Sequence, residues 1–337
     1  MMNQPTPARL FATMGAYQHT AALRTGIHLE LFTAIAEGNT EVPQIARRTA
    51  ASERGIRILC DFLTIMGFLT KTGESYGLAE DAMLFLNKHS PAYMGSVDVF
   101  LGSDMIKNAF AGLTEAVRKG STALGDQGSM APDHPCWVDF ARGMAPMMFM
   151  PATMIATAMH ASEMGPIKVL DIAASHGMYG LAFAKANAQA HIYAVDWASV
   201  LAVCEENAAR FGVSDRVHKI VGSAFDVDLG SDYDVILLPN FLHHFDKPTC
   251  ILLLKRMRAA LKPGGRLATA EFVPNDDRVS PPGAASFSLT MLVSTDSGDA
   301  YTFNEFDEMF RASGFGSSEM LELIPGTQSV IVTSTAA

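Results

Sequence analysis

Hydrophobic residues follow two different periods along the chain. From Phe11 to Ala36 apolar residues recur at helical spacing. The stretch VPQIARRTAASERGIRILCDFLTIMGFL predicts two helices with a turn near Ser52, the second helix ending near Gly67. The following LTKTGESYGLA alternates around a glycine, which is typical of a short hairpin. Helices and hairpin in this order predict an α-helical winged-helix domain over residues 1–90.

After this region the pattern becomes helical and connective, and then changes to alternating strands and helices. Strand-like apolar runs occur at KVLDIA, HIYAVDW, RVHKIVG, YDVILLPN and GRLATAEFV, with two further candidates around LELIPG and QSVIVTS. The alternation with helical stretches predicts βαβ units and a parallel sheet covered on both faces. We therefore expect an α/β fold, with a helical connector over 91–160 and a seven-strand Rossmann-like domain over 161–337.

Composition and charge narrow the class of protein. The chain has 337 residues, 49% of them hydrophobic and 18% charged, as in globular proteins. A net charge of −10 without any dense Lys/Arg run argues against a nucleic-acid partner. Apolar stretches are broken before ~18 residues, so no membrane span is expected. The first residues lack a signal-peptide layout and the four cysteines form no CxxC pair, which favours a cytoplasmic protein with reduced thiols.

The segment KVLDIAASHGMYG is the most informative one for cofactor binding. A hydrophobic strand ends at Asp171, and a helix opens after Gly177. Such a turn lets a ligand approach the backbone at the C-terminal edge of a sheet, although Asp171 could also serve only to satisfy the turn. The next strand ends at Asp196, where a carboxylate can accept both hydroxyls of a ribose. Ala173 and Ser175 would hinder a pyrophosphate, so we expect a nucleoside cofactor that lacks one.

Two adjacent histidines follow the buried strand DVILLPNFL and precede a helix that begins near Lys247. A neutral imidazole at this edge of the sheet can take a proton from a hydroxyl, which makes His243 a candidate general base. Glu271 ends a later strand. A structural histidine bonded to a backbone carbonyl remains an alternative. A metal site with His244 and Asp246 is disfavoured because adjacent side chains diverge, and we expect no metal.

The segment GMAPMMFMPATMIATAMH is rich in methionine. Methionine is adaptable and polarisable, which suits a pocket for an aromatic or sulfur-bearing ligand, although for any single methionine core packing of a helix is the better explanation. We expect Met147 and Met148 to contact the substrate. Arg142 could meet a substrate carboxylate, or it could form a salt bridge with Asp139 or Glu163.

The motifs VLDIAASHG, YAVDW, NFLHHFD and LKPGGRLATAEFVP occur in the order seen in class I S-adenosylmethionine-dependent methyltransferases. Together with the winged helix, they make the chain resemble the plant-type and acetylserotonin-type O-methyltransferase family from about residue 10 to residue 332. The resemblance implies S-adenosylmethionine as cofactor and a small-molecule methyl acceptor. It also implies a homodimer formed through the N-terminal domain and a connector that lines the substrate pocket.

The resemblance assigns roles to individual residues. Asp171 and Gly177 would line the methionine end of the cofactor, and Asp196 would bind its ribose. His243 would act as the general base, oriented by Glu271. The other cofactor contacts expected are Ala173, Trp197, Ser223, Ala224, Phe225, Asn240, Phe140 and Met144.

The sequence departs from the family pattern at several positions. The turn has AAS where the family has GGG, and Phe225 or Asp226 would supply adenine contacts in the GSAFD segment. His244 stands where the family usually has an aspartate, and we expect it near the substrate. A third family acid is replaced by Ala300, with Asp299 or Tyr301 as possible substitutes; of these, Tyr301 is the one we expect at the substrate.

These observations together predict O-methylation of a small, hydroxylated, aromatic metabolite. One alternative is methyl transfer to sulfur or carbon, in which His243 would only orient the substrate. Another is a winged-helix regulator that senses a ligand. The second helix of the winged-helix motif carries Arg54 and Arg57 but also Glu53 and Asp61, and this mixed charge disfavours DNA binding.

Overall fold

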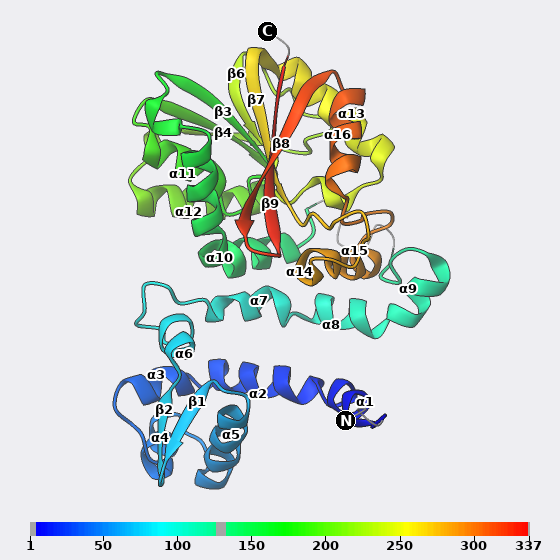
Figure 1. Ribbon diagram of the computed structural model, residues 1–337. Coiled ribbons are helices and arrows are strands. Elements are labelled where there is room, and N and C mark those ends of the chain that lie inside the picture. The colour runs from blue at the N-terminus through cyan, green and yellow to red at the C-terminus, as the bar shows by residue number, and fades with distance from the viewer. Residues whose placement is uncertain (1–4, 126–132, 336–337) are drawn as a thin grey trace. The chain divides into compact units, whose positions relative to one another are not determined.

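The computed structural model describes residues 5–125 and 133–335, and their contacts divide the chain into two units, Met1–Asp98 and Val99–Ala337. Most of the predicted connector, from Val99 onward, therefore packs with the C-terminal unit (Figure 1). Part of the Gly/Ser/Pro-rich connector, residues 126–132, lies outside the described residues.

The N-terminal unit consists of short helices and one hairpin in the predicted order. Its elements are α1 (Ala8–Met14), α2 (Tyr17–His28), α3 (Leu31–Ala36), α4 (Val42–Arg48), α5 (Glu53–Ile65), β1 (Leu69–Thr72), β2 (Ser75–Leu78), α6 (Glu80–Phe85) and η1 (Gly95–Val97). Helix α5 begins where expected because the side chain of Ser52 accepts the Gly55 N–H at 3.1 Å. A core that includes Phe32, Ile56 and Tyr76 holds the helices to the hairpin.

The C-terminal unit begins with helices that precede its sheet. These are α7 (Asp98–Leu101), α8 (Asp104–Ala111), α9 (Leu113–Lys119), the long α10 (Cys136–Ala158) and η3 (Ala161–Glu163). Helix α10 contains Pro146 and Pro151. Among the described helices, none combines the length and apolar character needed to cross a membrane.

Seven strands form the predicted sheet, in the order β5-β4-β3-β6-β7-β9-β8. They are β3 (Ile167–Ile172), β4 (Ala190–Asp196), β5 (Val217–Val221), β6 (Tyr233–Leu237), β7 (Leu261–Glu271), β8 (Phe315–Ile324) and β9 (Gln328–Thr335). Strands β3 to β7 are parallel, whereas β9 pairs antiparallel with β7 and β8. The strand order reverses beside β3, so a crevice opens at the carboxyl ends of β3, β4 and β6.

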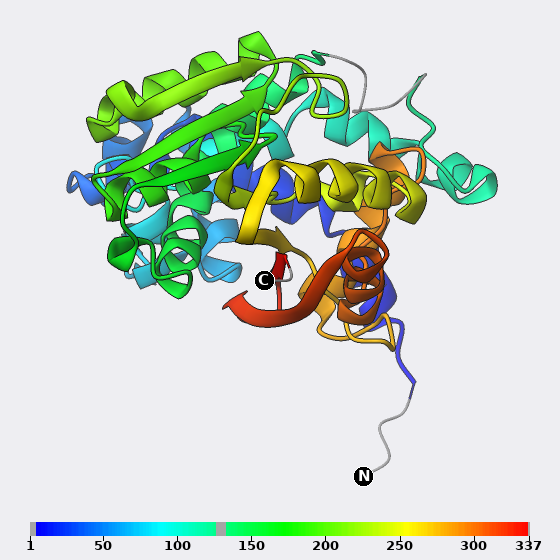
Figure 2. The same ribbon diagram turned by 90° about the horizontal axis from the view of Figure 1, so that it is seen from above.

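Helices cover both faces of this sheet. The helices between and after the strands are α11 (Met178–Ala186), α12 (Ala198–Phe211), η4 (Ser214–Arg216), η5 (Leu242–His244), α13 (Lys247–Ala260), α14 (Pro282–Ala285), α15 (Phe287–Ser294) and α16 (Phe303–Ala312), of which α14 and α15 lie beyond the end of the sheet (Figure 1). Helices α10, α11 and α12 contact one another on one side of the sheet (Figure 1). On the other side α13 and α16 lie next to each other (Figure 2).

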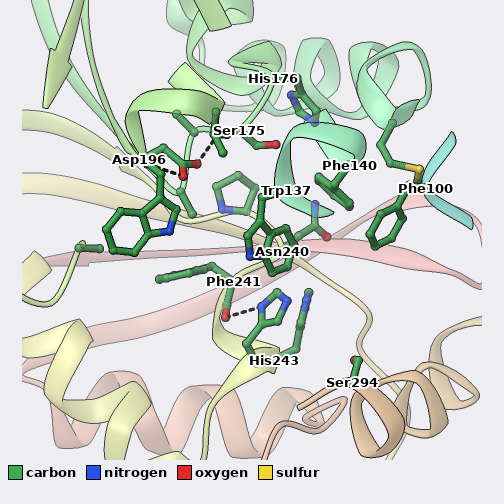
Figure 3. Close-up of a pocket in the computed structure, with 18 of the residues that line it drawn as sticks. Phe100, Trp137, Phe140, Ser175, His176, Asp196, Asn240, Phe241, His243 and Ser294 are labelled. Carbon is green, nitrogen blue, oxygen red and sulfur yellow. Dashed lines mark hydrogen bonds between the residues drawn. The ribbon is translucent and has the colours of Figure 1, made fainter. Parts of the chain in front are cut away.

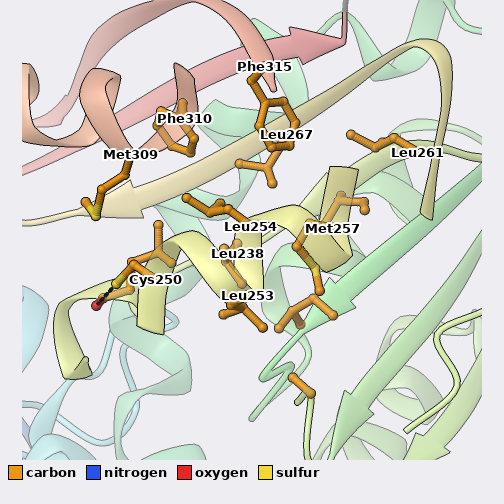
Figure 4. Close-up of a cluster of buried hydrophobic side chains, with 14 of the residues drawn as sticks. Leu238, Cys250, Leu253, Leu254, Met257, Leu261, Leu267, Met309, Phe310 and Phe315 are labelled. Atoms are coloured by element: carbon orange, nitrogen blue, oxygen red, sulfur yellow. Dashed lines mark hydrogen bonds between the residues drawn. The ribbon is translucent and has the colours of Figure 1, made fainter. Parts of the chain in front are cut away.

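The core between the sheet and helices α13 and α16 fixes the strand ends that carry the pocket. Its fully buried side chains include Leu253, Leu254, Met257, Leu267 and Phe310 (Figure 4). Apolar burial of this extent is the main source of rigidity in the sheet, at ~25 cal/mol per Å² of apolar surface removed from water. The loops that follow β3, β4, β6 and β7 therefore start from fixed points.

Candidate active site

A cavity of about 670 Å³ lies at the carboxyl ends of β3, β4, β6 and β7. Aromatic and methionine side chains dominate its wall (Figure 3). Nine of the eleven predicted cofactor residues line it, namely Ala173, Asp196, Trp197, Ser223, Ala224, Phe225, Asn240, Phe140 and Met144. Of the predicted substrate contacts, Met147, Met148 and His244 line the cavity, whereas Arg142 and Tyr301 do not.

The turn after β3 has the backbone conformation of a glycine turn, although only one of its residues is glycine. Ala173, Ser175 and Gly177 have φ angles of 51°, 52° and 77°. For an L-residue this left-handed conformation costs ~1–2 kcal/mol. At Gly177 a Cβ would lie 2.4 Å from the Cys204 sulfur, so glycine is required there. The AAS sequence thus keeps the shape of the turn and stores strain in it.

Asp171 and Gly177 stabilise the turn after β3 without lining the cavity. The Oδ2 atom of Asp171 accepts the Gly180 N–H at 2.9 Å, and a Cβ on Gly180 would lie 2.8 Å from that oxygen. The carboxyl group is fully buried, which raises its pKa well above the usual range. Neither Asp171 nor Gly177 is among the residues that line the cavity, and their expected contact with the methionine end of a cofactor stays a prediction.

Asp196 offers a half-buried carboxylate at the cavity wall. Its Oδ2 accepts the Ser175 N–H at 2.9 Å and its Oδ1 accepts the Trp197 N–H at 2.7 Å (Figure 3). Burial raises the pKa of Asp196 to about 6. Each oxygen keeps a lone pair for a second hydrogen bond, so the two together fit the adjacent hydroxyls of a ribose.

Helix α10 turns one face to the cavity. Trp137, Phe140, Met144 and Met148 lie on this face because they recur at helical spacing. Arg142 is half a turn away and forms a bidentate salt bridge with Glu206, with N···O distances of 2.9 and 2.8 Å. The proposed substrate contact of Arg142 is thereby corrected, and its salt-bridge partner is neither of the two acids considered from the sequence.

A chain of hydrogen bonds runs along one wall of the cavity, which Asn240, Tyr179 and Met148 line. The Gln328 amide donates to Oδ1 of Asn240 at 2.7 Å, and the Asn240 amide donates to the Tyr179 hydroxyl at 3.2 Å. That hydroxyl donates to the sulfur of Met148 at 3.4 Å. The chain joins β9, the loop after β6, α11 and α10.

His243 and Glu271 form a buried pair at the end of β7. The Nδ1 of His243 lies 2.5 Å from Oε2 of Glu271, while Oε1 of Glu271 accepts the Leu242 N–H at 3.1 Å. The ring of Phe287 packs edge-on against the imidazole, with centroids 4.8 Å apart. A carboxylate can only accept, so the imidazole proton lies on Nδ1 and Nε2 keeps its lone pair. This is the arrangement that a general base requires.

His244 lies beside His243, and its tautomer is also fixed. Its Nδ1 lies 3.1 Å from the Phe241 carbonyl, which can only accept, so Nδ1 carries the proton. Burial and the neighbouring His243 lower the pKa of His244 well below its usual value, so the ring is neutral. Its Nε2 lone pair is available to a ligand in the cavity.

Neither Asp299 nor Tyr301 takes the place of the third family acid. Ala300 is buried, and Asp299 contributes its backbone N–H to the His243 carbonyl at 2.9 Å while its carboxylate pairs with Arg278 at 3.1 Å. The Tyr301 hydroxyl donates to the Phe245 carbonyl at 2.6 Å. The expected role of Tyr301 at the substrate is thus corrected, because its hydroxyl is already bonded and does not reach the cavity.

His243, His244 and Asp246, the residues of the alternative metal site, are not arranged to bind one metal ion. The Asp246 carboxylate accepts the Thr249 N–H at 2.9 Å and caps α13, while His243 and His244 use their Nδ1 atoms for the bonds above. Within residues 5–125 and 133–335 no group of three or more His, Cys, Asp and Glu side chains could hold a metal ion.

Comparison with known proteins assigns the family. The model of the O-methyltransferase domain matches residues 113–316, and that of the O-methyltransferase dimerisation domain matches residues 11–88. The chain belongs to the O-methyltransferase family. This confirms the predicted enzyme class, a methyltransferase that uses S-adenosylmethionine to methylate small molecules, and the predicted architecture of a dimerisation domain followed by an α/β domain.

Individual relatives agree with this assignment. A Nostoc punctiforme protein provisionally assigned as an O-methyltransferase has 49% identity and a TM-score of 0.95, covering 98% of this chain and all of that one. The 3-hydroxy-5-methyl-1-naphthoate 3-O-methyltransferase of Streptomyces sahachiroi is 26% identical over 93% of this chain and 89% of its own length. Human N-acetylserotonin methyltransferase, solved with S-adenosylmethionine, has a TM-score of 0.86 at 20% identity over the full length of both chains, which shows a shared fold.

The O-methyltransferase site also contains residues that sequence reasoning missed. They are Phe100, Trp137, His176, Tyr179, Phe241, Phe287, Met291 and Ser294. Trp137 could have been found, because it precedes Phe140 by three residues on one helix face. His176 was visible as the large residue in a turn of small ones. Phe287 and Met291 carry no signal, since α15 reaches the cavity only through tertiary packing.

Proposed function

We propose that this O-methyltransferase methylates the hydroxyl of a small, uncharged, aromatic molecule, with His243 as the general base. The observation that carries the proposal is the buried pair of His243 and Glu271, which leaves the Nε2 lone pair of His243 toward the cavity. A neutral imidazole in this tautomer can accept the proton of a hydroxyl that lies within hydrogen-bond reach.

The proposed mechanism has a single proton transfer. The acceptor hydroxyl gives its proton to Nε2 of His243 as its oxygen forms the new bond to carbon. Bound S-adenosylmethionine would supply the methyl group as an electrophile, with its S–CH₃ bond breaking as the O–C bond forms and S-adenosylhomocysteine as the leaving group. Glu271 holds the imidazole in the required tautomer and offsets the positive charge that His243 gains. Base catalysis of this kind contributes ~100- to 10,000-fold, and fixed orientation of the two reactants supplies much of the rest.

The residues that would hold the cofactor lie along one side of the cavity. Asp196 would accept both ribose hydroxyls, because each of its oxygens has a lone pair left. Trp197, the residue after Asp196, and Phe225, in the loop after β5, also line the cavity and would enclose the adenine ring. Phe140 and Met144 of α10 would cover the amino-acid part and the sulfonium.

The side chains that line the rest of the cavity indicate the chemistry of the methyl acceptor. Its wall is made of apolar side chains from α7, α8 and α15 and from the end of β7, including Phe100, Ile106, Phe272, Phe287 and Met291. No Lys or Arg is among the described lining residues. Burying a carboxylate there without a partner would cost several kcal/mol. An uncharged aromatic acceptor is therefore favoured over a hydroxy acid.

His244 adds a hydrogen-bond acceptor to this mainly apolar wall, which also contains the polar residues Thr290, Ser294 and Asp296. Its Nε2 can only accept a hydrogen bond, because Nδ1 holds the proton. We therefore expect the acceptor to carry a second O–H or N–H group near the hydroxyl that is methylated. A thioether or a carbon nucleophile would make no use of the base, and for this reason O-methylation is favoured over the alternatives.

The experiment that tests the proposal compares His243→Ala with His191→Ala, a matched change of an exposed histidine. A screen of phenols, hydroxy acids and thioethers with labelled cofactor, followed by product mass analysis, identifies an acceptor first. His243→Ala should then lower kcat by ~100-fold or more while the dissociation constant of the cofactor stays unchanged. Turnover equal to that of the His191 control would contradict the role of His243 as the base.

We further propose that the N-terminal unit forms a homodimer and that the protein is cytoplasmic. The dimerisation-domain match supports the first point, as do exposed apolar side chains on α1 and α2, among them Phe11 at 69%, Met14 at 70% and Tyr17 at 70% exposure. All four cysteines are buried free thiols, which suits a reducing compartment. Light scattering at micromolar concentration should give twice the chain mass.

A further inference from the structure

Residues 298–301, between α15 and α16, lie against the backbone of the loop that carries His243. The Asp299 N–H donates to the His243 carbonyl at 2.9 Å. The Tyr301 hydroxyl donates to the Phe245 carbonyl at 2.6 Å. Two backbone carbonyls of the catalytic loop are thus bound by one short segment, which we call the 298–301 segment.

Gly298 is the point at which this segment comes closest to the base. A Cβ on this residue would lie 2.3 Å from the His243 carbonyl oxygen, 2.7 Å from the Thr295 hydroxyl oxygen and 3.0 Å from the His244 carbonyl carbon. Real Cβ atoms essentially never come closer than 3.0 Å to another heavy atom, so a side chain here would force the two backbones apart. The absence of a side chain at Gly298 is therefore what permits the bond between Asp299 and His243.

The 298–301 segment is also anchored on the side away from the base. The Arg278 guanidinium donates to the Asp299 carboxylate at 3.1 Å and to the Glu305 carboxylate at 2.6 Å. The second oxygen of Glu305 closes the capping box at the start of α16. Because these bonds hold the segment, a side chain at Gly298 would displace the backbone of His243 as well.

A displaced backbone would change the position of the imidazole. The ring of His243 is oriented by the contact of its Nδ1 with Oε2 of Glu271 at 2.5 Å. Glu271 is fully buried at the end of β7, so the sheet fixes it in place. Misplacement of a reacting group by ~1 Å costs on the order of 100-fold in rate. The close approach at Gly298 therefore affects proton transfer.

We propose that Gly298 is a positioning residue for methyl transfer: it lets the 298–301 segment bind the backbone of His243 and so keeps the imidazole in place for proton transfer. This inference rests on the proposed function, in which His243 is the base. The segment includes Ala300, at the position of the third family acid, and here it supports the histidine through backbone contacts. Because Gly298 acts through His243, its effect should disappear once the imidazole is removed.

The test is a double-mutant cycle of Gly298→Ala and His243→Ala, with labelled cofactor to measure low turnover. Gly298→Ala should lower kcat by ~10- to 100-fold, while the dissociation constant of S-adenosylhomocysteine stays unchanged. In the His243→Ala background the same substitution should leave kcat unaltered, because the group that it displaces is gone. The matched control is Gly165→Ala, an exposed position at which a Cβ would contact nothing within 4 Å.

A second variant, Arg278→Ala, loosens the 298–301 segment without a steric clash. Its side chain is 43% exposed, so the substitution leaves the core intact. Loss of the ion pairs with Asp299 and Glu305 should lower kcat roughly two- to fivefold when His243 is present, and not when it is absent. Arg278→Lys keeps one charged donor group and should retain part of the lost rate.

The outcomes separate this inference from the proposed function. A kcat of Gly298→Ala equal to that of Gly165→Ala overturns the inference. An equal loss in both backgrounds also overturns it, because the segment would then act through the acceptor wall or through stability. If circular dichroism shows that Gly298→Ala does not fold, the cycle with Arg278→Ala decides by the same criteria. Wild-type turnover of His243→Ala would instead remove the proposed function, and this inference with it.

Discussion

The Nδ1 atom of His243 lies 2.5 Å from Oε2 of Glu271, and the two side chains are 3% and 0% exposed. The second oxygen of the same carboxylate accepts the backbone N–H of Leu242, the residue directly before the histidine. Glu271 therefore fixes both the ring and the loop that carries it. Its position at the end of the central strand β7 makes the whole arrangement part of the sheet.

Glu271→Gln should disable the base without disturbing the cofactor. The backbone N–H of Leu242 requires an acceptor, so the amide oxygen would take the place of Oε1 and the amide NH₂ would face the imidazole. His243 would then accept at Nδ1 and carry its proton on Nε2, where it cannot act as a base. We expect kcat to fall by roughly 10⁴-fold, as in other enzymes whose histidine is held in the wrong tautomer.

Steady-state kinetics measures this effect, with calorimetry of S-adenosylhomocysteine binding alongside. The matched control is Glu206→Gln, which neutralises an exposed carboxylate bonded to Arg142. A Glu271→Gln enzyme with the kcat of this control would show that the carboxylate does not set the tautomer of the base.

Cofactor binding should depend on pH through Asp196. Burial raises the pKa of this carboxyl to about 6 in the free protein, and ribose hydroxyls would donate to its ionised form and lower the pKa in the complex. The affinity for the cofactor should then have its full value above pH 6. It should fall by about tenfold per pH unit as the pH drops below 6, until the pKa of Asp196 in the complex is reached. Calorimetry of S-adenosylhomocysteine between pH 5 and 8 measures this.

Asp196→Asn provides the control for this pH effect. The amide cannot titrate. The Asp196→Asn variant should therefore bind S-adenosylhomocysteine more weakly than the wild type, and its affinity should not change with pH around 6. Equal affinity of the wild type at pH 5 and pH 7.5 would remove Asp196 from the ribose site.

Ser175→Gly should stabilise the protein. Ser175 has a φ of 52°, and its hydroxyl is buried without a hydrogen-bond partner among the described residues. Glycine removes both costs, and the gain exceeds the added entropy of the unfolded chain, so unfolding free energy should rise by about 1 kcal/mol. Ala174→Gly, at the neighbouring buried position, should lower it by ~0.5–1 kcal/mol. Urea denaturation compares the two, and a destabilised Ser175→Gly would mean that the turn carries no strain.

Arg142→Ala should leave catalysis unchanged. The guanidinium is exposed and bonded to Glu206 on the side of α10 away from the cavity. Its kcat/KM should therefore equal that of the wild type for every acceptor, including one that carries a carboxylate. A rise in KM confined to carboxylated acceptors would return Arg142 to the substrate site.

Local patterns in the sequence predicted most of the fold. Apolar runs in the sequence predicted the strands. Acidic residues at strand ends predicted which edge of the sheet carries Asp196, His243 and Glu271, because the carboxyl ends of parallel strands share one edge. The position of Asp171 was not predictable in this way. Its strand end is the same, but the helix that follows brings Gly180 against it and closes it off.

Tertiary packing decided the remaining features of the site. By its position in the sequence, Asp299 or Tyr301 was expected to replace the third family acid beside His243. In the structure the Tyr301 hydroxyl bonds to the Phe245 carbonyl, and the Asp299 carboxylate pairs with Arg278. Phe287 reaches the imidazole from a helix that follows β7, and no periodicity in the sequence marks that contact. The directions of such side chains depend on distant elements, which spacing along the chain does not specify.

The hydrogen bonds from Gln328 through Asn240 and Tyr179 to Met148 all run in one direction along the cavity wall. Every link points the same way, so turning the Asn240 amide over would break two bonds at once. A change at one member of the chain therefore affects its neighbours. Reshaping this wall of the cavity would require coordinated replacement of several members of the chain.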